Sequence, residues 1–106
     1  MPEARVKLIV NVPVESADAV REAIAAAGAG RIGNYSSCSF SVTGKGRFLP
    51  LDGANPTIGT VGKIEVVEEE QIGITCEKEA LPAILEAMKV AHPYEEVAYE
   101  VYDLAN

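Results

Sequence analysis

Residues 30–63, GRIGNYSSCSFSVTGKGRFLPLDGANPTIGTVGK, decide the fold, and their composition differs from that of the flanking segments. Eight of the nine glycines of the chain lie between Gly28 and Gly62. Glycine is used where the backbone takes a positive φ or where another group approaches closely. The density of glycines therefore predicts a shaped loop or a long bulged hairpin, and excludes a helix over most of this stretch.

The first half of this stretch has the alternation of a β-strand. Over residues 34–42, Cys38, Phe40 and Val42 fall on one face and serines fall on the other. We expect Gly44 and Gly46 to interrupt this strand, with residues 47–49 continuing it past a bulge. Prolines at positions 50 and 56 then predict a loop, because proline cannot donate a backbone hydrogen bond to a strand ladder.

Hydrophobic periodicity predicts the elements on either side of this hairpin. We expect a strand over residues 6–12, a helix over residues 15–27, a strand from residue 63 to 76 with a bend or exposed bulge at the glutamates 68–70, a helix over residues 77–91 and a last strand over residues 97–101. The second helix should start near residues 78–81, because proline at position 82 fits only the first helical turn.

The order strand, helix, strand, strand, helix, strand predicts an α+β fold, the ferredoxin-like split β-α-β-β-α-β sandwich, as a single domain over residues 1–106. Both helices cover one face of a four-stranded antiparallel sheet. The other face, with Ile9, Ala98, Tyr102 and the serines of the second strand, is expected to be bare. An apolar face of small residues is better suited to another subunit than to water, so we expect a homo-oligomer.

Charge and composition exclude several classes of partner. A net charge of −7 argues against nucleic acid or an anionic membrane, because both reward clustered lysine and arginine. No apolar run is long enough to cross a bilayer, and the amino terminus lacks the apolar core of a signal peptide, so we expect a cytoplasmic protein.

Two cysteines, Cys38 and Cys76, have neither disulfide-framework nor metal-knuckle spacing. If residues 34–76 form one hairpin centred near residue 57, the two cysteines lie opposite each other. We expect them to be neighbours and reduced.

The segment His92-Pro93-Tyr94-Glu95-Glu96 concentrates titratable groups at the turn after the second helix. His92 with Glu95 or Glu96 could supply two or three ligands to a divalent ion, although tight binding would need further ligands from other subunits. The alternative is that His92 bonds to backbone, Tyr94 packs against the end of the sheet and the glutamates are solvated. His92 is the only histidine, so one copy cannot form a histidine-rich metal site.

Two blocks of the sequence carry a resemblance to a known family, GAGRIGNYSSCSFSVTGKGRFLPLDGANPTIGTVGKIEVVEE and AHPYEEVAYEVYDL. Through them, nearly the whole chain resembles the domain inserted in the YqfO family, the Nif-like dinuclear-metal hexamer proteins. That domain is similar in fold to CutA and the PII signalling proteins, which are trimers, and CutA has a similar His-Pro-Tyr-Glu stretch. The paired metals of the full-length family are held by flanking halves that this sequence lacks. The hydrolase or cyclohydrolase label of the family is therefore not expected to apply.

This resemblance, with the density of motifs, predicts a stand-alone, non-catalytic, homotrimeric binding or regulatory domain of unknown ligand, in which clefts between subunits form the site. The expected site residues are Asn34, Tyr35, Ser37, Cys38, His92, Tyr94, Glu95 and Glu96. No cofactor should be required. The first alternative is a divalent-metal binder of CutA type that uses His92 with Glu95 or Glu96. A lower-ranked alternative is a PII-like sensor of anions or nucleotides that uses Lys45, Arg47 and Lys63.

Overall fold

The computed structural model describes residues 4–105 and shows an elongated molecule of 50 × 23 × 22 Å. Its strands are β1 (Arg5–Pro13), β2 (Phe40–Phe48), β3 (Glu65–Glu77) and β4 (Tyr99–Asp103). Its helices are α1 (Ala17–Ala26) and α2 (Leu81–Ala91), which follow the short 3₁₀ turns η1 (Val14–Ser16) and η2 (Lys78–Ala80). The first three residues, where no signal peptide is expected, lie outside the described part.

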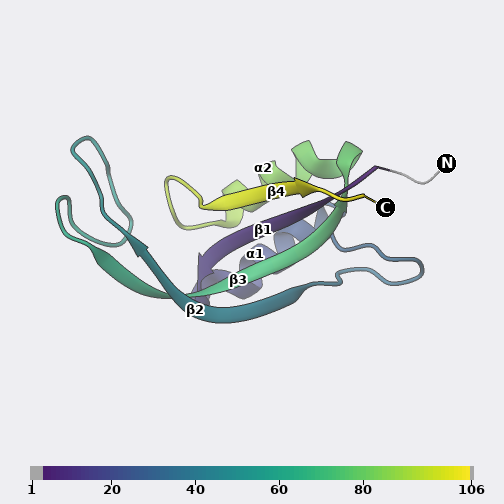
Figure 1. The fold of residues 1–106 in the computed structure, drawn as a ribbon, viewed down its shortest axis with the longest axis horizontal. Coiled ribbons are helices and arrows are strands. Elements are labelled where there is room, and N and C mark those ends of the chain that lie inside the picture. The colour runs from purple at the N-terminus through teal and green to yellow at the C-terminus, as the bar shows by residue number, and fades with distance from the viewer. Residues whose placement is uncertain (1–3, 106) are drawn as a thin grey trace.

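The four strands form one antiparallel sheet in the order β2-β3-β1-β4, with α1 and α2 together on one face (Figure 1). This arrangement confirms the ferredoxin-like prediction. The core lies between the sheet and the helices, where every second residue of β1 is buried against one apolar stripe from each helix. The fully buried members with the largest side chains are Leu8, Val10, Ile24, Ile72, Ile84 and Met88.

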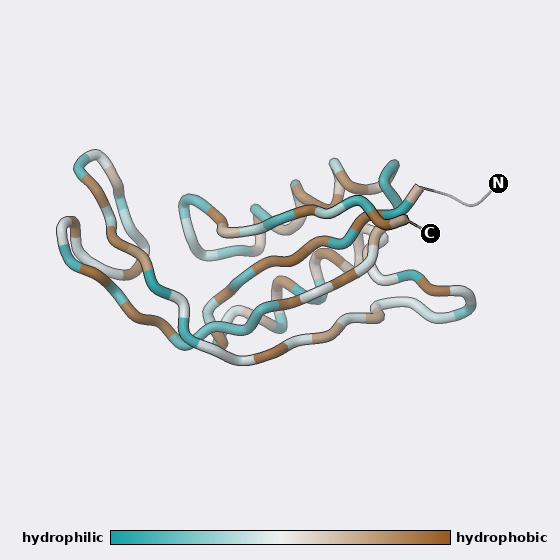
Figure 2. The backbone as a smooth tube through the Cα atoms, viewed as in Figure 1, coloured by the Kyte–Doolittle hydropathy of each residue, from teal (hydrophilic) through white to brown (hydrophobic). Residues whose placement is uncertain are grey.

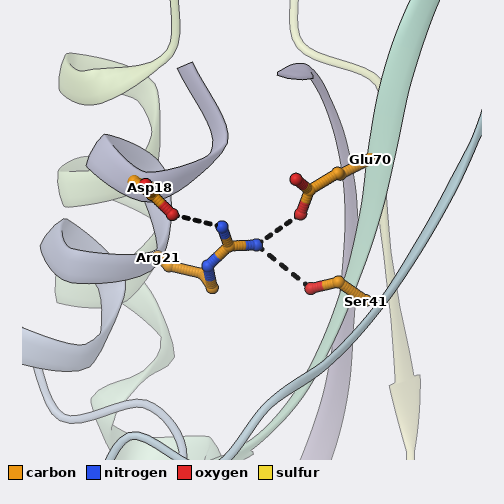
Figure 3. A network of polar contacts seen from close by, with 4 residues as sticks. All are labelled: Asp18, Arg21, Ser41 and Glu70. Atoms are coloured by element: carbon orange, nitrogen blue, oxygen red, sulfur yellow. Dashed lines mark hydrogen bonds and ion pairs between the residues drawn. The ribbon is translucent and has the colours of Figure 1, made fainter. Parts of the chain in front are cut away.

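A cluster of polar contacts joins α1 to the sheet (Figure 3). The Arg21 guanidinium donates hydrogen bonds to the carboxylates of Asp18 and Glu70 and to the hydroxyl of Ser41. Since Glu70 belongs to β3 and Ser41 to β2, a single side chain connects the helix to both strands. Ser41 therefore lies on the helix side, and the expectation that the serines line the bare face is wrong at this position.

The second strand differs from its prediction in several respects. It begins at Phe40 rather than near residue 34, and it continues through Gly44 and Gly46 in unbroken register with β3. The predicted interruption and bulge are therefore absent from the β2–β3 ladder, as is the bulge expected at residues 68–70. Phe40 and Val42 lie on the face opposite Ser41, and both are exposed.

The expected pairing of Cys38 with Cys76 is also wrong. Phe40 pairs with Gly73, one residue away from the expected register. The backbone of Gly30 lies between Cys38 and β3: its N–H donates to the Thr75 carbonyl, and its own carbonyl accepts from the Cys38 N–H. A Cβ on Gly30 would lie 2.7 Å from the Cys38 backbone nitrogen, so only glycine fits here. Both cysteines are free thiols.

The end of the β2–β3 hairpin extends beyond the helices and turns past the end of the sheet, at the left of Figure 1. We call residues 46–67 the hairpin arm. Figure 2 shows apolar segments along it, and these side chains are exposed rather than packed in the core. Its exposed large apolar residues are Leu49, Leu51, Val61, Ile64 and Val66. No helix within residues 4–105 is long and apolar enough to cross a membrane.

Candidate functional site

The turn after α2 is held in place by His92. This residue ends the helix in an extended conformation, and its side chain is buried. The ring Nε2 lies 2.7 Å from the Asn11 carbonyl of β1, and Nδ1 lies 3.1 Å from the backbone nitrogen of Tyr94. Because a carbonyl can only accept, Nε2 carries the proton and Nδ1 accepts from the Tyr94 N–H. Burial lowers the pKa of His92, which keeps the imidazole neutral.

Tyr94 connects this turn to the sheet. Its ring packs edge-on against Phe48 of β2, with ring centroids 5.6 Å apart. Its hydroxyl donates to Glu69 Oε2 on β3 at 3.0 Å. Burial, followed by the bond to Glu69, raises the pKa of Tyr94 well above its usual value, so the hydroxyl keeps its proton. Tyr94 is therefore a fixed donor that faces a carboxylate.

The carboxylate of Glu69 occupies the space above Gly46. Glu69 is only 8% exposed, although it lies in a run of three glutamates. A Cβ on Gly46 would lie 1.9 Å from Glu69 Oε1, a distance that no side chain could accept. A side chain at position 46 would therefore displace the Glu69 carboxylate.

A cavity of about 640 Å³ opens between this group and the hairpin arm; we call it the arm cleft. Asn11 and Glu69 lie on the sheet side, Tyr94, Glu95 and Glu96 lie on the turn side, and residues 46–54 and 56–58 complete it. Two contacts join the arm to the turn. The Asn55 N–H donates to Glu95 Oε2 at 2.9 Å, and the Thr57 hydroxyl donates to the Pro93 carbonyl at 2.7 Å.

The charged lining of the arm cleft is mainly acidic. Its carboxylates are Asp52, Glu69, Glu95 and Glu96, and Arg47 is its basic residue. Low-dielectric walls strengthen the field of such groups, so the cleft favours a positive ligand over a negative one.

Only half of the predicted site residues meet here. Tyr94, Glu95 and Glu96 line the arm cleft, and His92 supports their turn. The predicted residues of the first block, Asn34, Tyr35, Ser37 and Cys38, lie in the loop before β2, at the opposite end of the molecule (Figure 1).

The separation of the two blocks follows from the contacts of each with β1. The loop accepts a hydrogen bond from Arg5, through the carbonyl of Arg31, whereas His92 contacts Asn11. Six residues of strand separate these contacts, which corresponds to about 20 Å. Within one chain the two blocks do not form one site, and their meeting across a subunit boundary stays a prediction.

The residues considered for anions and metals are not gathered either. Lys45, Arg47 and Lys63 are exposed, and only Arg47 lines the arm cleft. Within residues 4–105, no group of three or more His, Cys, Asp and Glu side chains is placed to hold a metal ion. Both His92 ring nitrogens are already in hydrogen bonds, so coordination would have to break one of them.

Glu69 and the arm residues of the cleft were not predicted. Glu69 belongs to Glu68-Glu69-Glu70, for which the sequence predicts a bend or an exposed bulge. Strand alternation counted back from the buried Ile72 would have placed Glu70 on the helix side and Glu69 on the bare face. The sequence contains no signal for the burial of Glu69, because that burial depends on the approach of Tyr94 from the far end of the chain.

Comparison with known proteins supports the resemblance noted in the sequence. The chain is 51% identical over 96 residues to a Bacillus subtilis protein named GTP cyclohydrolase 1 type 2 homolog, covering 91% of this chain and 26% of that protein. A Mycobacterium leprae protein of the same name is 48% identical over 98 residues, which cover 92% of this chain and 26% of that protein. The crystal structure of a Bacillus cereus protein related to NIF3 superposes with a TM-score of 0.86 at 46% identity, and the match covers 98% of this chain and 26% of that one.

The chain is therefore homologous to a segment of NIF3/YqfO-family proteins. It spans about a quarter of the length of the curated relatives it matches. No family model matches the chain. This chain also has the fold of CutA: the Archaeoglobus fulgidus periplasmic divalent cation tolerance protein CutA superposes with a TM-score of 0.70 at 15% identity, covering 96% of this chain and 85% of that one.

Proposed function

We propose that this chain is a non-catalytic, oligomeric binding domain that holds a small ligand in the arm cleft. The observation that carries the proposal is the cleft itself, with a volume of about 640 Å³ and a nearly buried carboxylate, Glu69, at its base. Clefts of this size that combine apolar walls with a few fixed polar groups are typical of small-molecule sites.

The chemistry of the described residues supports binding rather than catalysis. The two His92 nitrogens are bonded to backbone groups, so the ring is not free to accept a substrate proton. Burial raises the pKa of the Cys76 thiol to about 11, so it stays protonated and unreactive near neutral pH. Cys38 lies in the distant loop before β2. The cyclohydrolase name of the longer relatives thus finds no assembled nucleophile and base here.

Exposed apolar side chains support self-association. The bare face and its edge carry Phe40, Val42 and Tyr102, which are 72%, 50% and 51% exposed, and the hairpin arm adds five further exposed apolar residues. A second copy of the chain would remove this surface from water. We favour a homotrimer, in which a neighbour could bring Asn34, Tyr35, Ser37 and Cys38 toward the His92 turn. The free thiols of both cysteines suit a cytoplasmic location.

A divalent-metal site is the second candidate function, because carboxylates are concentrated in the arm cleft. Glu95 and Glu96 would be its ligands, joined by His92 after it releases a backbone partner. Metal affinity would then rise as pH increases through the titration of His92, since only the neutral imidazole coordinates. An affinity that does not change with pH would remove His92 from the site. The cationic residues Lys45, Arg47 and Lys63 give weaker support to an anion sensor, because they do not converge.

Two measurements test the proposal. The first is the native mass with and without a chelator: a mass near that of a trimer, unchanged by the chelator, is expected, and a monomer would refute the oligomer. The second is a small-molecule fragment screen followed by amide NMR shifts. Fragments that shift the amides of residues 48–58 and 94–96 support the arm cleft, and fragments that bind only elsewhere count against it.

A further inference from the structure

Glu69 is a nearly buried carboxylate without a counter-ion. It is 8% exposed, and among the described residues its single hydrogen-bond donor is the Tyr94 hydroxyl, which contacts Oε2. Oε1 receives no hydrogen bond within residues 4–105 and is not one of their fully buried atoms, so it is open to the cleft; the ion pairs found there involve Asp18, Glu70 and Asp103 instead. Buried charges are ordinarily paired, because removing them from water is costly.

The surroundings of this carboxylate fit a particular class of partner. The carboxylate lines the arm cleft together with Tyr94, whose hydroxyl bonds to it, and with Phe48, whose ring contacts that of Tyr94 edge-on. Carboxylates and aromatic faces both attract organic cations, the first by charge and the second through the ring quadrupole. Leu51 and Ile58 on the arm offer an apolar wall to the rest of such a ligand.

We propose that the arm cleft binds an organic cation, a primary ammonium or guanidinium group on an apolar body, with its positive head on Glu69 Oε1. This inference rests on the proposed ligand-binding function and specifies its substrate class. The cationic head supplies the missing donor and charge at Oε1, while Tyr94 holds Oε2. The remaining acids of the cleft, Asp52, Glu95 and Glu96, add to the attraction, and Arg47 alone opposes it.

A metal ion fits the same atoms less well. A divalent ion needs several oxygen or nitrogen ligands around one point. The described residues do not offer three His, Cys, Asp or Glu side chains so arranged, and the volume of about 640 Å³ is far larger than one ion. One carboxylate with aromatic neighbours and an apolar wall is instead sufficient for an amine.

The test compares benzylamine with benzyl alcohol, which has nearly the same shape but no charge. Binding to the unmodified protein at neutral pH is followed by amide NMR shifts. We expect benzylamine to bind in the arm cleft at least about tenfold more tightly than the alcohol, the factor expected for a hydrogen bond to a charged group. This comparison needs no mutation, so it stands even if a variant fails to fold.

Glu69→Gln should reduce benzylamine affinity at least about tenfold, since it keeps the shape and the Tyr94 contact but removes the charge. Glu68→Gln is the matched control: it makes the same change in net charge one residue away, on the exposed opposite side of β3. It should leave the affinity within about twofold, because exposed charges at this distance are screened.

Three outcomes would overturn the inference. Equal binding of the amine and the alcohol in the cleft would refute the cation while leaving the binding function intact. No shift from either compound, together with no fragment in the cleft, would refute both. A third result is that Glu69→Gln lowers the native mass while benzylamine does not bind. Glu69 would then pair with a lysine of a second copy of the chain, and binding of a small organic cation would be refuted.

Discussion

Replacing Gly46 and Gly44 by alanine in separate variants makes the same chemical change twice on one strand, with opposite expected results. Both glycines lie in β2 on the bare face, and neither has a positive φ, so alanine is allowed by the backbone at each. At Gly46 the new Cβ would lie 1.9 Å from Glu69 Oε1. At Gly44 no atom of the described chain lies within 4 Å of the new methyl group. Only Gly46→Ala must displace the carboxylate.

The magnitudes follow from these contacts. Displacing Glu69 breaks its hydrogen bond with Tyr94, and a bond to a charged group contributes about 1.5–3 kcal/mol. Alanine recovers about 0.5–1 kcal/mol by restricting the unfolded chain. Gly46→Ala should therefore lower the free energy of unfolding by about 1–2 kcal/mol. Gly44→Ala has only the second contribution and should raise it by about 0.5–1 kcal/mol.

The assays are urea unfolding and thermal unfolding, both followed by circular dichroism at one protein concentration because association also affects stability. The thermal midpoints should differ by roughly 8 °C, at about 4 °C per kcal/mol for a domain of this size. The NMR shifts of Tyr94 should differ from those of the unmodified protein in Gly46→Ala and should be unchanged in Gly44→Ala. Equal stability of the two variants would refute the placement of Glu69 over Gly46, and with it the assembled base of the arm cleft.

Three further predictions concern the surrounding contacts. Burial lowers the folded pKa of His92 below its unfolded value of 6.5, so the unfolded chain binds the proton first as pH falls. The urea midpoint should therefore be constant above about pH 7 and decrease as pH falls below that value. His92→Gln should remove this dependence of the urea midpoint on pH. Arg21→Met leaves the half-buried carboxylate of Glu70 without its partner and should lower the free energy of unfolding, measured in urea, by about 1–3 kcal/mol. Asp18→Asn changes a carboxylate that is 87% exposed and should lower the same free energy by less than about 1 kcal/mol. Thr57→Val removes the hydrogen bond to the Pro93 carbonyl and should speed amide hydrogen exchange in the hairpin arm. The thermal midpoint should change by less than about 2 °C. Unchanged exchange would show that this contact does not hold the arm.

The elements of regular periodicity could be predicted from the sequence. Val6, Leu8, Val10 and Val12 alternate without interruption, and all four are buried in β1. Both helices begin and end within about three residues of their predicted bounds, because proline and glycine mark their ends clearly. These elements have one face against a shared core, so their local pattern and their burial agree.

The second strand could not be predicted from its alternation. Serines alternate with larger residues from position 37 onward, which imitates a strand, but Ser37 takes a φ of 60° and so turns the chain before β2 begins. β2 is also an edge strand whose end extends past the helices, so neither of its faces is required to be apolar throughout. The pattern there reflects local turns and single contacts rather than a core.

Two motifs that the sequence presents separately meet at one side chain in the structure. The Gly-Lys-Gly of β2 and the His-Pro-Tyr-Glu-Glu turn are far apart in the chain, and Glu69 contacts both: its carboxylate lies over Gly46 and accepts the Tyr94 hydroxyl. His92 in turn fixes the backbone of Tyr94 against β1. A glycine that looks like an interruption thus makes room for a carboxylate, and the histidine that looks like a ligand is a support. If this is correct, the effects of Gly46→Ala and Tyr94→Phe on stability should not add, because each removes the same hydrogen bond.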